Sequence, residues 1–308
     1  GGAGFIGRYV VQRLAKADWT VRVAGRDLTR AAQLKHLGVV GQVAPTLANI
    51  RDDASVAQAV DGADVVINLV GILFESGKNK FDAVQAEAPG RIARAAKAAG
   101  ARAMVHVSAI GASDTSDAAY ARTKAAGEAA VFAGFPEATV LRPSIVFGPE
   151  DNFFNQFAAM STFAPFLPLI GGGHTRFQPV YVDDVAAAVM AAITQPDATG
   201  RTFELGGPRV YSFRELMEHV LAETGRKTGL LPLPFGAASI MGRFGELLPK
   251  PFLTRDQVTL LKSDNVCAEN APGLAALGIE AASVESVTPK YLWRFRRGGR
   301  WAFKREKV

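Results

Sequence analysis

Apolar residues recur in two alternating patterns through the first two thirds of the chain. Ile6, Val10 and Leu14 are spaced four residues apart, which predicts a helix with one buried face. Short apolar runs that alternate with such helices are typical of a parallel sheet covered on both faces. We therefore predict a doubly wound α/β fold of the Rossmann type. The predicted strands are 20–24, 42–48, 64–71, 103–108 and 201–205, and the predicted helices include 86–99 and 186–193.

The chain opens on a glycine-rich stretch directly before the first predicted helix. Gly1, Gly2, Gly4 and Gly7 fit both G-x-G-x-x-G and G-x-x-G-x-x-G. Such glycines let a strand turn sharply into a helix beneath the pyrophosphate of a dinucleotide, although an ordinary glycine turn is the alternative. A buried strand normally precedes this turn, so we expect about ten residues, and any targeting peptide, to lie before Gly1.

The end of the second strand of this fold selects between NAD and NADP. An acidic side chain there binds the ribose of NAD, and a basic one binds the 2′-phosphate of NADP. Gly25-Arg26 occupies this place, and Arg8 lies close to the turn, which favours NADP(H). Asp27 follows directly, so NAD(H) remains the less favoured alternative. Arg26 could also be an ordinary solvated surface charge with no role in cofactor binding. Asn49 and Ile50 end the next strand, where an adenine contact is expected.

Tyr120 and Lys124 lie one helical turn apart after the strand 103–108. A nearby ammonium group lowers the pKa of a phenol, which would let Tyr120 exchange a proton with a carbonyl. His106 lies inside the strand, and we interpret it as a packed residue rather than a catalytic one.

Four motifs together resemble the extended or atypical short-chain dehydrogenase/reductases, over nearly the whole chain. They are the glycine turn, the Tyr120/Lys124 pair, Leu141–Pro149 and Val180–Val185. The resemblance implies that Tyr120 and Lys124 hold the nicotinamide ribose and that 143–146 flank the ring. With the adenine contact included, the predicted cofactor-binding residues are Gly1, Gly4, Phe5, Ile6, Gly7, Arg8, Arg26, Asn49, Ile50, Leu69, Val70, Gly71, Val107, Ser108, Tyr120, Lys124, Pro143, Ser144, Ile145 and Val146.

Several of these stretches, with Gly148–Phe153, Gln178–Asp183 and Thr254–Val258, look like one branch of that family. The branch comprises the nucleotide-binding accessory subunits of respiratory complex I. This resemblance implies a protein bound to other complex I subunits, peripheral on the bacterial cytoplasmic or mitochondrial inner membrane, on its cytoplasmic or matrix side, with NADPH as a structural ligand.

The resemblance implies a catalytic set of Ser108, Tyr120 and Lys124, but this set is incomplete compared with an active reductase. Ala109 and Ile110 follow Ser108, and Tyr120 comes only twelve positions after Ser108. Ser113 or Ser116 could substitute for Ser108. We therefore expect a protein that is not catalytic by itself. A soluble NADPH-dependent reductase or epimerase that uses Tyr120 and Lys124 is the main alternative, and a redox-sensing scaffold is a third.

Composition argues against a membrane-spanning protein, a protein with an internal disulfide and a zinc protein. Hydrophobic residues make up 48% of the chain and charged residues 21%, as in globular proteins. No run reaches the eighteen or so apolar residues of a membrane-spanning helix. The single cysteine, Cys267, fits a reducing compartment, and no Cys/His cluster has metal-ligand spacing.

The charge is concentrated at the end of the chain. The net charge is +6, and 290–308 carries eight basic residues and one glutamate, so the other residues sum to −1. Tyr291, Trp293, Phe295, Trp301 and Phe303 interleave with these cations, a mixture that suits a lipid interface or RNA. Because the rest of the chain predicts no nucleic-acid fold, we favour docking near a membrane.

We divide the chain into a dinucleotide-binding domain and a smaller region. The domain spans 1–148, and 178–205 returns to it. The smaller region comprises 149–177 and 206–289, and 290–308 is a basic aromatic tail. Aromatic residues between 153 and 167 could form a core, a pocket lid or a docking surface. The apolar stretch 230–248 predicts an amphipathic helix that covers a core or contacts a partner or membrane.

Overall fold

The computed structural model describes residues 1–246, 248 and 251–299. Contacts between residues divide the chain into two units, which we treat separately. Unit 1 comprises Gly1–Pro143, Val182–Leu205 and Ala268–Glu280, and unit 2 comprises Ser144–Tyr181, Gly206–Cys267 and the residues from Ala281 onward. In the described part of the chain, none of the helices is long and apolar enough to cross a membrane.

The strands of unit 1 pair in parallel, as the alternating pattern predicts, and their hydrogen bonds form two sheets. The first sheet pairs β1 (Val21–Gly25) with β2 (Val43–Leu47). Pro45 lies in β2, where an edge position tolerates the missing donor. The second sheet has the order β10-β5-β4-β3, built from Thr202–Leu205, Thr139–Pro143, Ala103–Val107 and Val65–Asn68.

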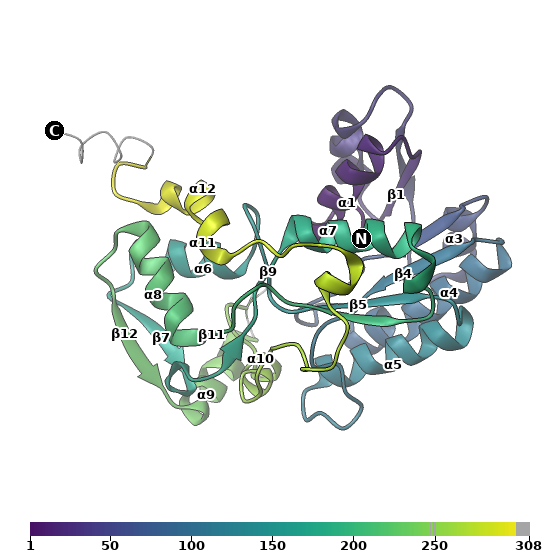
Figure 1. The fold of residues 1–308 in the computed structure, drawn as a ribbon. Helices are drawn as coiled ribbons and strands as arrows, with labels where there is room; N and C mark the ends of the chain where they lie inside the picture. The colour runs from purple at the N-terminus through teal and green to yellow at the C-terminus, as the bar shows by residue number, and fades with distance from the viewer. Residues whose placement is uncertain (247, 249–250, 300–308) are drawn as a thin grey trace. The chain divides into compact units, whose positions relative to one another are not determined.

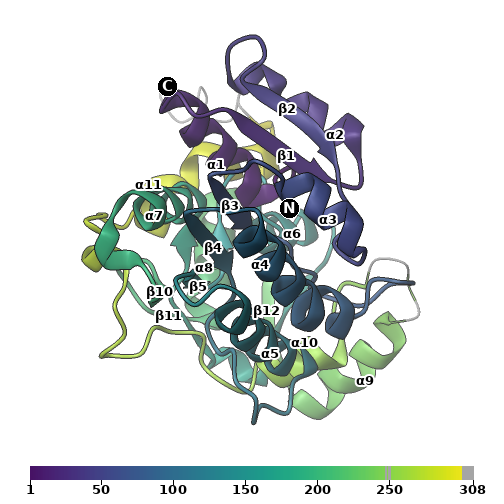
Figure 2. The ribbon, with the colours of Figure 1, turned by 90° about the vertical axis from the view of Figure 1, so that its right-hand side faces the viewer.

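Helices cover both faces of the four-stranded sheet (Figures 1 and 2). On one side α7 (Val182–Thr194) packs against the sheet and against α1 (Phe5–Lys16), and Arg13 of α1 pairs bidentately with Asp183 at 2.8 Å. The other side carries α3, α4 and α5, which span Asp53–Val60, Ala88–Ala98 and Ala119–Gly134. The short helix α2 (Leu28–Ala32) and the 3-10 helix η1 (Gln33–Leu37) connect β1 to β2.

The helical segment that contains α4 begins earlier than the predicted residue 86, because a π-helix, η2 (Asp82–Glu87), leads directly into α4 at Ala88. π-Helical turns inside helices are frequent at functional sites. Helix α5 approaches this turn so closely that a Cβ on Gly127 would lie 2.0 Å from the Gln85 carbonyl oxygen. Gly127 therefore permits the contact that fixes η2 against the helix carrying Tyr120 and Lys124.

Unit 2 is built around a core of aromatic and aliphatic side chains. Phe147, Phe154, Leu167, Leu216 and Met217 are fully buried there. Its strands are β6 (Val146–Phe147), β7 (Phe166–Ile170), β8 (Arg176–Phe177), β9 (Val180–Tyr181), β11 (Tyr211–Ser212) and β12 (Gly229–Leu233). Its helices are α6 (Phe153–Met160), α8 (Phe213–Thr224), α9 (Phe235–Gly245), α10 (Arg255–Leu260), α11 (Val284–Val287) and α12 (Pro289–Leu292).

The sequence left the roles of two stretches open, 153–167 and 230–248. The aromatic residues of the first contribute to both the core and the surface. Phe154 and Leu167 belong to the core, whereas Phe163 is 80% exposed and Phe166 is 54% exposed. The apolar entry to the predicted amphipathic helix is the strand β12, which pairs in parallel with β7, so the helix α9 begins only at Phe235.

The division into two units differs from the predicted boundaries. Residues 144–148 and 178–181, assigned to the dinucleotide-binding domain, belong to unit 2. Residues 268–280, assigned to the smaller region, pack in unit 1, because the Pro272 carbonyl accepts from the Glu204 amide of β10. The tail assigned to 290–308 begins inside unit 2. Tyr291 and Leu292 are buried, since the Tyr291 hydroxyl donates to the Asp151 carboxylate at 2.7 Å. Residues 300–308 of the tail lie outside the described residues.

Candidate nucleotide-binding site

The glycine turn packs too tightly for a side chain at Gly1 and Gly7. The Gly4 amide donates to the Gly1 carbonyl at 2.9 Å, and α1 starts at the next residue without a side-chain cap. A Cβ on Gly7 would lie 2.3 Å from the Gly2 oxygen, and one on Gly1 would lie 2.5 Å from the Leu69 carbonyl carbon. The first amides of α1 and its positive dipole end are therefore presented beside a bare backbone, as an anion requires.

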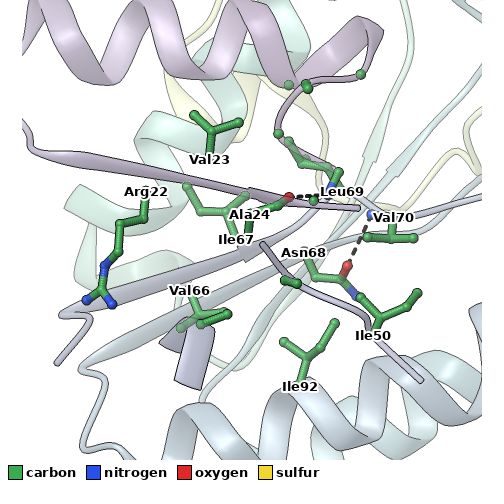
Figure 3. A pocket seen from close by; sticks show the side chains of 18 of the residues that line it. Arg22, Val23, Ala24, Ile50, Val66, Ile67, Asn68, Leu69, Val70 and Ile92 are labelled. Atoms are coloured by element: carbon green, nitrogen blue, oxygen red, sulfur yellow. Dashed lines mark hydrogen bonds between the residues drawn. The ribbon is translucent and has the colours of Figure 1, made fainter. Parts of the chain in front are cut away.

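A cavity runs from this turn along β1 and β3. Its apolar part, where Figure 3 shows Val23, Ile67 and Ile92, lies between the two strands that flank the first strand of a doubly wound sheet, so only the end at the glycine turn is a candidate for the nucleotide. Among the described residues no hydrogen-bonded ladder joins β1 to β3, and the cavity lies between them. Of the predicted cofactor residues, those lining it are Gly1, Gly4, Gly7, Arg26, Asn49, Ile50, Leu69, Val70 and Gly71.

Three arginines line the cavity near the carboxyl ends of β1 and β2. Arg26 was predicted, whereas Arg30 and Arg51 were not singled out in the sequence. Asp27, the acidic residue that kept NAD(H) as an alternative, caps α2 by accepting from the Arg30 amide at 3.1 Å. The Asp27 carboxylate is therefore already hydrogen-bonded as the N-cap of α2. The three arginines are then the main charged groups at this end of the cavity.

Asn49 and Ile50 also lie at the cavity, and their polar groups are engaged. The Asn49 amide donates to the Ser55 hydroxyl at 2.9 Å, and its side-chain oxygen accepts from the Arg51 amide at 3.3 Å. The Ile50 carbonyl accepts from Arg91 at 3.0 Å. These bonds fix the backbone after β2 and leave the Ile50 side chain against the cavity (Figure 3).

Neither Tyr120 nor Lys124 lines the cavity, but Lys124 lies beside Gly71, which does. Lys124 is buried on α5 and donates to the Val107 carbonyl at 3.3 Å, and its ammonium lies 5.9 Å from the centre of the Tyr120 ring. A Cβ on Gly71 would lie 3.4 Å from that ammonium. Burial lowers the pKa of Lys124 to about 8, although the nearby Glu128 carboxylate opposes this shift.

Ser108 is buried directly after β4, and its hydroxyl has no hydrogen-bond partner within the described residues. It is therefore not hydrogen-bonded to Tyr120, whereas a working reductase set would favour such a bond. An unpartnered buried hydroxyl is costly, so Ser108 is suited to a ligand contact.

Asn68 and His106 form a buried polar pair that the sequence did not predict, and Asn68 lines the cavity. The Asn68 side-chain oxygen accepts from the Val70 amide at 3.1 Å (Figure 3), and its amide nitrogen lies 3.0 Å from His106 Nδ1. Asn68 thereby shapes the backbone along the cavity. Burial, and secondarily the Lys124 ammonium, lowers the pKa of His106 to about 3. The one available signal was a polar residue within the apolar run 64–71.

Gln85 was also missed, and nothing in its local pattern marks it. It is buried in η2, accepts from the Ile72 amide at 3.3 Å and donates to the Thr123 hydroxyl at 3.3 Å. It therefore ties the loop after β3 to α5, one residue before Lys124.

The remaining predicted residues do not line the cavity. Phe5, Ile6 and Arg8 lie in the first turns of α1, and Val107 lies in β4. Pro143 ends β5, and its carbonyl accepts from the Ile110 amide at 3.0 Å. Ser144, Ile145 and Val146 belong to unit 2, where the Ser144 hydroxyl donates to Asn265 Oδ1 at 2.7 Å. Their contact with a cofactor stays a prediction.

Known proteins share this organisation over most of the chain. The model of the NAD dependent epimerase/dehydratase family matches residues 1–206. The NADH dehydrogenase (ubiquinone) 1 alpha subcomplex subunit 9, mitochondrial, of Rattus norvegicus is 38% identical over 299 residues, which cover 96% of this chain and 79% of that protein. A ceramide reductase of Caulobacter vibrioides is 30% identical over 236 residues, covering 76% of this chain and 72% of its own.

A solved structure confirms the predicted fold. The triphenylmethane reductase of a Citrobacter species matches with a TM-score of 0.75 and 18% identity, covering 95% of this chain and 97% of that one. At this identity the likeness concerns the fold alone. The family match and the identity to the rat protein, in contrast, reach the sequence itself. The chain therefore belongs to the NAD dependent epimerase/dehydratase family and, within it, to the family of the alpha subcomplex subunit 9.

Proposed function

We propose that this protein is a non-catalytic accessory subunit of respiratory complex I that holds NADP(H) as a structural ligand. The observation that carries the proposal is the 38% identity to a mitochondrial complex I subunit across 96% of the chain. The glycine turn adds physical support, because Gly1 and Gly7 leave no room for a side chain and both line the cavity.

The residues at the cavity fit a dinucleotide with a 2′-phosphate. The pyrophosphate would lie at the start of α1, the adenosine near Asn49 and Ile50, and the 2′-phosphate near Arg26. NADP(H) could supply a hydride when bound. In an accessory subunit its contribution is stability instead, since a ligand bound only by the folded chain favours that state by mass action.

Replacing Arg26 by aspartate tests this proposal. We expect about a tenfold to hundredfold loss of NADPH affinity, because a bidentate cation is replaced by a repelling charge. The melting temperature with NADPH present should fall by several degrees, as the ligand's stabilisation is lost. Thermal melting with and without NADPH measures this effect. Purification from native membranes in mild detergent, followed by mass spectrometry, measures assembly, which should also decrease.

Lys262→Asp provides the matched control, because Lys262 is exposed in unit 2 and the change in charge is the same. Equal nucleotide stabilisation and equal assembly in the wild type and Arg26→Asp would contradict the proposal. Steady NADPH-dependent turnover of a carbonyl compound, lost in Tyr120→Phe, would instead establish a reductase. The ceramide reductase relative and the buried Lys124 beside Tyr120 favour that alternative.

We further propose that the protein is peripheral on the inner membrane and docks through α9. Three apolar side chains of this helix are exposed: Ile240 by 62%, Met241 by 49% and Phe244 by 67%. The opposite side of α9 packs through Ala238 and Gly242, and Gly242 lies against the backbone of Thr254 and Arg255. Among the residues of unit 2 that the structure describes, none covers this exposed side.

Phe244→Glu is expected to reduce the complex I subunits that co-purify with the protein by about tenfold, since it places a charge on an apolar contact. Quantitative mass spectrometry of the detergent-purified sample checks this. NADPH-dependent thermal stabilisation should stay unchanged, because α9 lies outside the unit that carries the cavity. Full recovery of those subunits with the variant would exclude α9 as the docking surface.

A further inference from the structure

The loop after β3 forms a short strap at the mouth of the cavity. We call residues 72–81 the strap. Its tip is a tight turn in which the Ser76 and Asn79 backbones exchange hydrogen bonds of 3.1 and 2.9 Å, and Gly77 has a positive φ of 52°. Its base is pinned by Glu75, which accepts from the Phe81 amide at 2.8 Å.

Two arginines from neighbouring strands hold the tip of the strap. Arg26, which follows β1, donates to the Asn79 side-chain oxygen at 2.8 Å. Arg51, which comes shortly after β2, donates to the Lys78 carbonyl at 2.8 Å. Arg26, Arg51 and Asn79 all line the cavity. The strap is thus fastened by cations that the proposed 2′-phosphate would also attract.

The bond from Asn79 uses only one corner of the Arg26 guanidinium. It involves Nη1, and within the described ranges no other hydrogen bond holds this side chain. The edge formed by Nε and Nη2 is left for a planar, bidentate contact with a phosphate. Asn79 carries no charge, so it orients Arg26 without neutralising it, which a carboxylate in the same place would do.

We propose that Asn79 is a positioning residue that sets the preference for the 2′-phosphate by fixing Arg26, and that phosphate binding in turn fixes the strap. The inference rests on the proposed NADP(H) function. The other end of the strap reaches the ribose side of the site, because the buried Phe81 packs edge-on against Tyr120 with ring centres 6.0 Å apart. Occupancy of the phosphate site is thereby connected to the position of Tyr120.

Two adenosine probes that differ only in the 2′-phosphate test the proposal on the full chain. Adenosine 2′,5′-bisphosphate and adenosine 5′-monophosphate are titrated by calorimetry into the wild type, Asn79→Ala and Asn79→Asp. We expect the wild type to prefer the bisphosphate and Asn79→Ala to lower that preference about tenfold. Asn79→Asp should lower it further, because its carboxylate competes for Arg26.

Hydrogen exchange adds a readout that a loss of stability alone would not produce. The bisphosphate, and not the monophosphate, should slow exchange at 76–81 in the wild type, and this difference should disappear in Asn79→Ala. Ser76→Ala is the matched control, because the hydrogen bonds of Ser76 to the described residues are its backbone bonds with Asn79. It should retain the wild-type preference.

Each outcome decides the proposal. An unchanged preference in Asn79→Ala overturns the role of Asn79 and leaves NADP(H) binding intact. An equal loss of affinity for both probes also overturns it, since the strap would then merely shape the pocket. A wild type without preference for the bisphosphate overturns both this inference and the proposed NADP(H) selectivity.

Discussion

Replacing Gly7 by alanine should abolish nucleotide binding. The added Cβ would lie 2.3 Å from the Gly2 oxygen and 2.7 Å from the Gly1 oxygen, so the turn itself must open. Because these are backbone atoms, no side chain can move aside to relieve the clash. We expect the Kd for NADPH to rise by more than about a hundredfold, which corresponds to a loss of roughly 2.7 kcal/mol of binding free energy. Isothermal calorimetry measures this directly.

A matched glycine-to-alanine change separates this effect from a general loss of stability. Gly236 lies exposed on α9, with no atom within 4 Å of an added Cβ. Gly236→Ala should therefore keep the wild-type affinity and stabilise the helix by roughly 0.5–1 kcal/mol. Wild-type NADPH affinity in Gly7→Ala would show that the turn does not cradle the pyrophosphate.

Acid should destabilise the fold through His106. Its pKa is lowered to about 3 by burial, whereas an unfolded histidine titrates near 6.5. Between these values the unfolded state binds the proton and the folded state does not, so stability falls as the pH falls. The loss begins below pH 6.5 and amounts to about 1.4 kcal/mol for each pH unit, or about 4 kcal/mol by pH 3.5.

Urea denaturation of the wild type and His106→Gln between pH 7 and pH 4 measures this contribution. The variant should lack the His106 part of the slope, so the difference in unfolding free energy between the two proteins should shrink or reverse on acidification. Asp151 has a raised pKa through burial and acts in the opposite direction, but it is present in both proteins. The same slope in both would contradict the assignment, and His36→Gln, at an exposed site, should match the wild type.

Local patterns predicted those parts of the fold that local physics determines. The glycine turn, the parallel strands and the helix carrying Tyr120 and Lys124 follow from spacing within short stretches. The strand run 64–71 ends early, at Asn68, because this side chain turns to the Val70 amide and to His106. Its polar character was visible in the sequence, but its partner in the next strand was not.

Long-range pairs explain what sequence reasoning missed. The composition of 290–308 indicates a charged surface, yet Tyr291 is buried because its hydroxyl meets Asp151, 140 residues earlier. Likewise, Asn79 looks like an ordinary turn residue until the structure brings Arg26 to it, 53 positions away. Gln85 has no periodic or motif signal, because its importance comes only from the contact between η2 and α5.

The interleaving of the two units bears on how the chain folds during synthesis. Unit 1 takes its last segment, 268–280, from beyond most of unit 2, and this segment supplies the partner of the Glu204 amide. A nascent chain that has reached residue 206, where the family match ends, still lacks that partner. The nucleotide-binding unit is therefore completed late, after much of unit 2 has left the ribosome, and its edge at β10 is exposed until then.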